Sequence, residues 1–123
     1  MRFATLGLTL LAALATGCGP TCQTTCAKIY GQVADGNCGR SIPGEDREES
    51  YARCVDTCER GLDIPGELDG YNPNERITSG TIPNLENEKQ VAAWMDCVWE
   101  ATGGEVKGCV NISPREGGIC GPI

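Results

Sequence analysis

The sequence predicts a mainly α fold, a small disulfide-rich domain of three helices with a long irregular loop and a cysteine-bearing tail. Apolar residues recur at helical spacing in three segments. Nine cysteines occur in 123 residues. Aromatic residues make up only 5% of the chain, which predicts a thin apolar core. Small exported domains commonly offset a thin core with disulfides, so we expect the cysteines to be structural.

The first predicted helix begins at Cys22. Its apolar face consists of Cys22, Cys26, Ile29, Tyr30 and Val33. Thr21 is a candidate N-cap, because a threonine hydroxyl can accept a hydrogen bond from the first turn. The turn-forming sequence Asp35-Gly36-Asn37 is expected to end the helix.

The second predicted helix carries the apolar stripe Tyr51, Cys54, Val55, Cys58 and Leu62. Acidic residues at its start suit the helix dipole: Glu45, Asp46, Glu48 and Glu49. Glu49 and Arg53 are expected to form an i,i+4 ion pair. The same spacing predicts a pair between Asp56 and Arg60. Gly61 is the expected terminator.

The third predicted helix runs from about Leu85 to Thr102. Asn84 or Asn87 is the expected N-cap, and Gly103-Gly104 the expected stop. Its apolar face consists of Val91, Trp94, Cys97, Val98 and Ala101. Trp99 points away from that face, so it either contacts a partner or packs beneath the tail.

Two segments read as irregular. Asp63–Pro83 is rich in glycine and proline and unusually long for a loop, which indicates a functional role or anchoring by packing. Tyr71, within this loop, is a candidate contact for a partner. The tail Gly108–Ile123 carries the last two cysteines, with a short strand expected at Val110–Ile112.

The N-terminus has the order of a secretory signal. Arg2 precedes an uncharged stretch over residues 4–15, which is shorter than the roughly 20 residues that a spanning helix needs. Ala15-Thr16-Gly17-Cys18 resembles the lipobox of bacterial lipoproteins, whose cysteine is acylated and becomes the N-terminus. The resemblance implies a signal peptide at 1–17, an acylated Cys18 with a tether to residue 21, and a domain over 22–123. Cleavage after Ala15 without a lipid is the alternative.

The odd number of cysteines favours the lipid anchor. An exported chain with an odd count carries a free thiol or an intermolecular bridge. If Cys18 is acylated, all the others can pair. These are Cys22, Cys26, Cys38, Cys54, Cys58, Cys97, Cys109 and Cys120.

Two cysteine pairs, Cys22/Cys26 and Cys54/Cys58, each lie one helical turn apart on one face. Antiparallel packing of the two helices would close Cys22–Cys58 and Cys26–Cys54. This arrangement resembles the twin CX3C hairpins of small intermembrane-space chaperones, although the connection here is longer. The resemblance implies a hairpin and no chaperone role. The other four cysteines allow three pairings, and the sequence does not choose among them.

Composition excludes several classes of function. A net charge of −7 argues against a nucleic-acid partner, because such binding rests on phosphate neutralisation. The chain contains no histidine, which excludes a Ser–His or Cys–His nucleophile and weakens a zinc site. It also has no Cys-x-x-Cys motif. We therefore expect no catalytic residues, no metal and no cofactor.

The part of the chain after the signal peptide is similar to small uncharacterised cysteine-rich lipoproteins of Gram-negative bacteria. The similarity rests on the two helical cysteine pairs, on Tyr71–Arg76, and on Asn87–Gln90 leading to Ala93–Cys97. The similarity implies a shared fold and a shared cellular location, and it implies no activity.

We therefore expect a lipid-anchored protein of the bacterial cell envelope, with a binding or structural role and not an enzyme. Its partners would be the bilayer, through acylated Cys18, and an unidentified protein. Gly19 follows Cys18 where an aspartate would resemble the inner-membrane retention signal, which favours the outer membrane. The alternatives are a thiol–disulfide redox protein and a disulfide scaffold of the protease-inhibitor or toxin-like kind.

Overall fold

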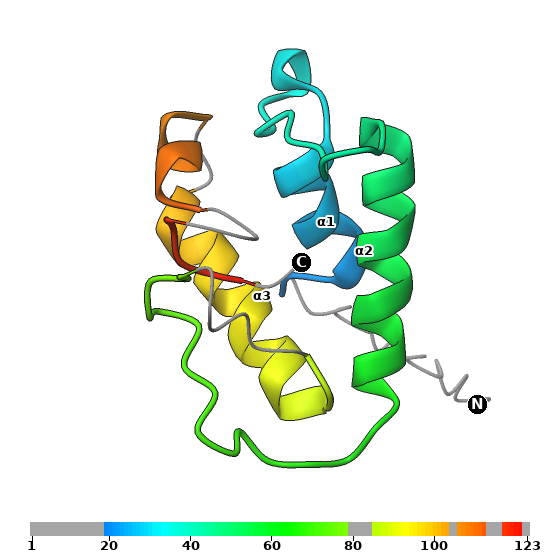
Figure 1. Ribbon diagram of the computed structural model, residues 1–123, viewed down its shortest axis with the longest axis vertical. Coiled ribbons are helices and arrows are strands. Elements are labelled where there is room, and N and C mark those ends of the chain that lie inside the picture. The colour runs from blue at the N-terminus through cyan, green and yellow to red at the C-terminus, as the bar shows by residue number, and fades with distance from the viewer. Residues whose placement is uncertain (1–18, 79–84, 104–105, 113–116, 122–123) are drawn as a thin grey trace, which may run out of the picture.

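The computed structural model describes residues 19–78, 85–103, 106–112 and 117–121. The elements in these ranges are α1 (Cys22–Tyr30), η1 (Val33–Asp35), α2 (Arg47–Leu62), α3 (Glu88–Thr102) and η2 (Val106–Asn111), where η denotes a 3-10 helix. Each α-helix contacts the other two. Figure 1 shows α1 beside α2, with the connection from α2 passing along the lower end of the view and then up the outer side of α3. The predicted class, a small disulfide-rich domain of three helices, is confirmed.

The start of α1 is capped as predicted. The Thr21 hydroxyl accepts a hydrogen bond from the Thr24 amide at 3.1 Å, and the Thr24 hydroxyl accepts one from the Thr21 amide at 2.9 Å. This reciprocal pair satisfies two amides that the helix itself leaves without acceptors. The helix can therefore begin immediately before its first disulfide cysteine.

The end of α1 comes earlier than predicted. The helix stops at Tyr30, and Val33 is 57% exposed instead of continuing the apolar face. The cause is a return of the chain, in which the Cys38 amide donates to the Lys28 carbonyl at 2.8 Å. Gly31 permits this return, because a Cβ there would lie 2.3 Å from the Ala27 carbonyl oxygen.

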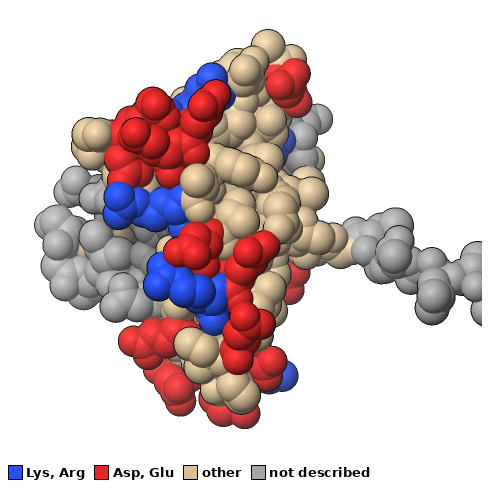
Figure 2. Space-filling model, turned by 90° about the vertical axis from the view of Figure 1, so that its right-hand side faces the viewer, with Lys and Arg blue, Asp and Glu red and all other residues tan. Residues whose placement is uncertain are grey.

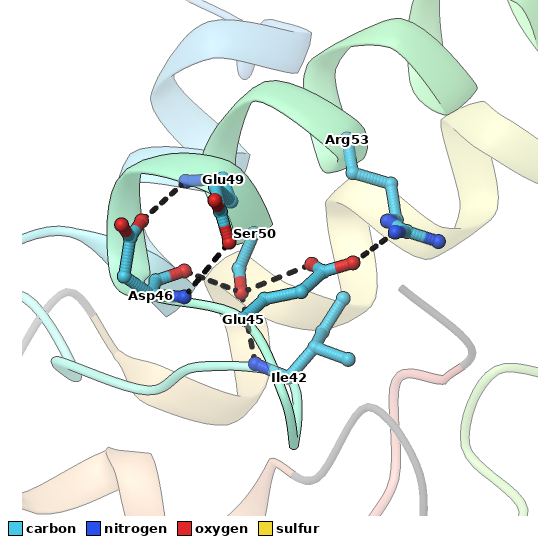
Figure 3. Close-up of polar contacts among 6 residues, drawn as sticks. All are labelled: Ile42, Glu45, Asp46, Glu49, Ser50 and Arg53. Atoms are coloured by element: carbon cyan, nitrogen blue, oxygen red, sulfur yellow. Dashed lines mark hydrogen bonds and ion pairs between the residues drawn. The ribbon is translucent and has the colours of Figure 1, made fainter.

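A second capping box starts α2 (Figure 3). Asp46 accepts from the Glu49 amide at 2.8 Å, and the Glu49 carboxylate accepts from the Asp46 amide at 3.2 Å. The buried Ser50 hydroxyl donates to the Asp46 carbonyl and accepts from the Ile42 amide, each at 2.9 Å. Ser50 therefore joins the first turn of α2 to the segment that precedes it.

One of the two predicted ion pairs on α2 is present. Asp56 and Arg60 lie 2.7 Å apart, both largely exposed, so the pair contributes little stability. Arg53 pairs with Glu45 and not with Glu49 (Figure 3). The Glu49 carboxylate is occupied in the capping box and does not pair with Arg53. The expected Glu49–Arg53 ion pair was therefore wrong.

Gly61 lies inside α2 and does not end it. The helix continues to Leu62, and the Asp63 amide closes its last turn on the Arg60 carbonyl at 3.3 Å. A Cβ at Gly61 would lie 2.5 Å from Cγ2 of the fully buried Val91 on α3. The lack of a side chain at Gly61 therefore allows α2 to lie close to α3.

The third helix is close to its predicted bounds. It begins at Glu88, and Asn87 is its N-cap, accepting from the Lys89 amide at 3.1 Å. The alternative cap Asn84 lies outside the described residues. Gly103 adopts the left-handed conformation at φ 54° and ends the helix as predicted. Trp94, fully buried on α3, is the largest side chain of the core.

The short strand expected at Val110–Ile112 was wrong. Residues 106–111 form the 3-10 helix η2, and Ile112 makes only a single parallel bridge with Ile119. A Cβ at Gly108 would lie 2.4 Å from the Thr102 carbonyl oxygen, so η2 packs directly on the end of α3. This contact and the adjoining Cys109 disulfide hold the segment in a compact turn.

Gly61→Ala should lower the free energy of unfolding. Alanine is favoured over glycine inside a helix by about 1 kcal/mol. Overpacking against the stiff Val91 side chain costs about 1–3 kcal/mol and should outweigh that gain. Chemical denaturation measures the difference, and Gly61→Ala/Val91→Ala tests whether relieving the contact restores the benefit. Ala52→Gly, at an exposed site of α2, measures the difference in helix propensity between alanine and glycine without a packing contact. A rise of about 1 kcal/mol in Gly61→Ala would contradict the close packing.

Candidate functional site

Four disulfides join the eight cysteines that follow Cys18. The outer pair Cys22–Cys58 and the inner pair Cys26–Cys54 connect α1 to α2, with Cα separations of 5.7 and 5.8 Å. These are the two bridges expected from the helical spacing. Among the three pairings left open for the remaining cysteines, the structure has Cys38–Cys109 and Cys97–Cys120, with Cα separations of 5.5 and 5.6 Å.

The last two bridges attach irregular segments to the helical core. Cys38, on the return after α1, holds Cys109 of η2. Cys97, on α3, holds Cys120 in the C-terminal segment. Cys18, the candidate lipidation site, and the candidate signal peptide 1–17 both lie outside the described residues.

The C-terminal segment is also held by two buried aromatic side chains. The Trp94 indole N–H donates to the Cys120 carbonyl at 3.0 Å. The Tyr71 hydroxyl donates to the Gly121 carbonyl at 2.7 Å. The Cys120 amide, in turn, donates to the Pro73 carbonyl at 2.7 Å. The loop, α3 and the end of the chain therefore form one hydrogen-bonded unit.

Tyr71 is a core residue. Its side chain belongs to the core cluster, and the residue is only 9% exposed. Burial raises the pKa of its hydroxyl well above the ordinary value, because the phenolate would lose its hydration. The sequence proposed Tyr71 as a contact for a partner, and the structure leaves little of it accessible.

Trp99, the other candidate contact, is half-buried. Its indole Nε1 is enclosed and has no hydrogen-bond partner within the described part of the chain. A buried N–H without an acceptor costs about 1–3 kcal/mol. Because this donor is enclosed, the accessible part of the indole has no hydrogen bond to offer a partner.

The loop after α2 is irregular, as predicted, but the start of α3 holds its backbone in place. The Ile64 carbonyl accepts from the Glu88 amide at 2.8 Å. The Glu67 carbonyl accepts from the Asn87 side chain at 2.9 Å, and the Leu68 carbonyl from the Gln90 side chain at 3.1 Å. Residues 79–83 of the predicted loop lie outside the described residues.

The last residue of α2 and this held loop expose apolar side chains. Leu62, Ile64 and Leu68 are 39%, 49% and 45% exposed. The sequence signal was available, because these residues interrupt an otherwise acidic and turn-forming stretch. From the sequence, Leu62 was expected on the apolar stripe of the second helix, whereas the structure exposes it. Ile64 and Leu68 were not among the candidate contact residues.

Described residues also line two hollows on the surface, apart from this loop. One, of about 430 Å³, lies between the tail and the end of α3 and is lined by Asn74, Arg76, Ala101, Val110, Asn111, Gly117 and Ile119. The other, of about 330 Å³, lies between the end of α1 and the start of α2, with Tyr30 and Tyr51 in its wall. Neither lining contains a cysteine.

Within the described ranges, no group of three or more His, Cys, Asp or Glu residues is placed to hold a metal ion. Nor does any helix there combine the length and apolar character needed to cross a membrane. Comparison of the chain with protein families, curated proteins and solved structures finds no match.

Tyr71→Phe should lower the free energy of unfolding by about 1–3 kcal/mol, because the buried Gly121 carbonyl loses its donor. Tyr51→Phe is the matched control, since Tyr51 is half-buried and its hydroxyl makes no hydrogen bond in the described part of the chain. Denaturant titration compares the two. Equal effects in both variants would argue against the anchoring role of Tyr71.

The raised pKa of Tyr71 also predicts a loss of stability in alkali. An unfolded tyrosine ionises near pH 10, whereas folded Tyr71 keeps its proton. The stability that protonated Tyr71 contributes to the folded state is therefore complete below about pH 10 and declines as the pH rises further. Between pH 9 and 11, the stability of Tyr71→Phe should fall less steeply than that of the wild type, by up to about 1.4 kcal/mol per pH unit. Parallel slopes in unfolding titrations would contradict this.

Alkylation under denaturing, non-reducing conditions should label none of the eight bridged cysteines. All of them are in disulfides, which offer no thiolate to the reagent. Mass spectrometry of the digested protein locates any label, and Cys18→Ser removes the remaining cysteine as a control. A substantial label on Cys38 or Cys109 would point to an open or labile bridge.

Proposed function

We propose that the protein is a lipid-anchored component of the bacterial cell envelope whose domain binds a partner or serves a structural role without catalysis. The observation that carries the proposal is the cysteine pairing. Every cysteine after Cys18 has a partner within the domain, which leaves Cys18 as the thiol available for acylation. Four disulfides are typical of oxidising compartments and support an address outside the cytoplasm.

The tether supports a domain lying close to the bilayer. Only Gly19, Pro20 and Thr21 separate Cys18 from the first turn of α1. Three extended residues reach about 10 Å. Dual acylation, as in bacterial lipoproteins, is sufficient for stable anchoring.

The distribution of charge favours α1 as the side nearer the membrane. The exposed residues of α1, Gln23 and Thr24, are uncharged, and Lys28 is buried with its ammonium donating to the Gly36 carbonyl at 2.9 Å. The outer face of α2 carries most of the charge in Figure 2, with acidic groups prominent. The acidic start of α2 lies away from the tether, because Cys58, near the other end, is bridged to Cys22.

One observation favours the redox alternative. The Arg40 guanidinium donates to the Cys109 carbonyl at 2.8 Å, beside the Cys38–Cys109 bridge. A neighbouring cation stabilises a thiolate and can make a disulfide easier to reduce. Reduction of this bridge by a mild thiol while the other three persist, with turnover of a disulfide substrate such as insulin, would favour a redox protein. Equal resistance of all four disulfides to reduction would support the non-catalytic role.

Mass spectrometry of the mature protein tests the anchor. We expect an N-terminal Cys18 carrying a diacylglycerol and recovery of the protein with the membrane fraction. Cys18→Ser should abolish the lipid mass and release the domain, with its four disulfides intact as the control for folding. An unmodified N-terminus at Thr16 in the wild-type protein would contradict the proposed lipid anchor.

A further inference from the structure

Residues 62–70, which are the last residue of α2 and the loop after it, are called here the platform loop. They combine exposure with a held backbone. Single exposed apolar side chains are ordinary in soluble proteins. The platform loop has three within seven residues: Leu62, Ile64 and Leu68. Three exposed apolar side chains so close in sequence are unusual on a domain whose core is small.

The backbone beneath these side chains is already ordered. Its carbonyls at residues 64, 67 and 68 accept hydrogen bonds from the start of α3. Asp69 and Gly70 form a tight turn with φ of 50° and 81°, closed by the Tyr71 amide on the Leu68 carbonyl at 2.8 Å. A Cβ at Gly66 would lie 2.6 Å from the Asn87 side chain, so the loop is packed as well as bonded. A partner would therefore lose little free energy to ordering this surface.

Acidic side chains alternate with the apolar ones. Asp63, Glu67 and Asp69 are all exposed. The ion pairs in the described ranges, Arg53–Glu45 and Arg60–Asp56, do not involve them. The platform loop therefore carries three exposed carboxylates outside these ion pairs next to its apolar residues in the sequence, and this charge favours a partner of the opposite sign.

We propose that the platform loop docks a segment of a partner protein that presents basic and apolar side chains together. Apolar contact with Leu62, Ile64 and Leu68 would supply affinity, while the three carboxylates would select lysine or arginine at the edge. A bilayer surface suits the site less well, since anionic headgroups would meet the same carboxylates. The inference does not depend on acylation of Cys18.

Site-specific photocrosslinking in cells that naturally produce the protein tests the inference. Benzoylphenylalanine would replace Leu68 in the full chain, and the same residue at Val110, which is 80% exposed on η2, is the matched control. We expect a protein adduct from position 68 and none of the same mass from position 110. Sequencing of the crosslinked peptide must show a segment with basic and apolar residues.

A charge-reversal variant separates specific docking from chance contact. Asp63→Lys/Glu67→Lys/Asp69→Lys in the position-68 protein should reduce the adduct about tenfold or more, as expected for a loss of at least about 1.4 kcal/mol. Asp35→Lys/Glu48→Lys/Glu100→Lys makes the same change of charge at exposed residues outside the platform loop and outside both ion pairs, and it should leave the adduct unchanged. Intact disulfides on non-reducing gels show that each variant folds. A lipid adduct, an acidic or purely polar partner segment, an adduct insensitive to charge reversal, or no adduct would each overturn the proposal.

Discussion

The two disulfides between α1 and α2 are the constraint on which the rest of the structure depends. α1 has nine residues, and isolated helices shorter than about 12–15 residues are marginal in water. The bridges Cys22–Cys58 and Cys26–Cys54 fix this short helix on α2 at two points one turn apart. That spacing sets the relative rotation of the helices and their antiparallel direction. It also places the tether at the start of α1 beside the C-terminal half of α2.

The third helix packs against this hairpin at a close contact, and buried hydrogen bonds attach the tail. Gly61 lets α2 meet Val91 of α3 without a Cβ between them. Trp94 of α3 and Tyr71 of the loop donate hydrogen bonds to the carbonyls of residues 120 and 121. These buried hydrogen bonds hold an irregular segment that has no helix or sheet of its own. Large apolar side chains are scarce, so covalent bridges and buried polar contacts carry much of the organisation.

A rigid scaffold of this kind is suited to presenting side chains. The two hollows lined by described residues contain no cysteine. The apolar groups left accessible at and after the end of α2 lie on a backbone held by the start of α3. The proposed anchor at Cys18 and the proposed docking surface at the platform loop would act together. The first would keep the domain at a membrane, and the second would select a partner there by charge and apolar contact.

Signals that act within one turn of the chain determined the helices, their caps at Thr21 and Asn87, and the two bridges of the hairpin. A helical period and a capping hydroxyl operate over three or four residues, so they can be read without knowing what lies across from them. Contacts between distant segments decided the rest. Val33 left the apolar face because the chain returned onto the end of α1, and Gly61 proved to be a packing residue because Val91 lies opposite it. The choice of Cys38–Cys109, the burial of Tyr71 and the absence of a strand at Val110–Ile112 likewise required the placement of the tail against α3. Sequence spacing alone does not carry that information, because many arrangements of the same helices satisfy the same local pattern.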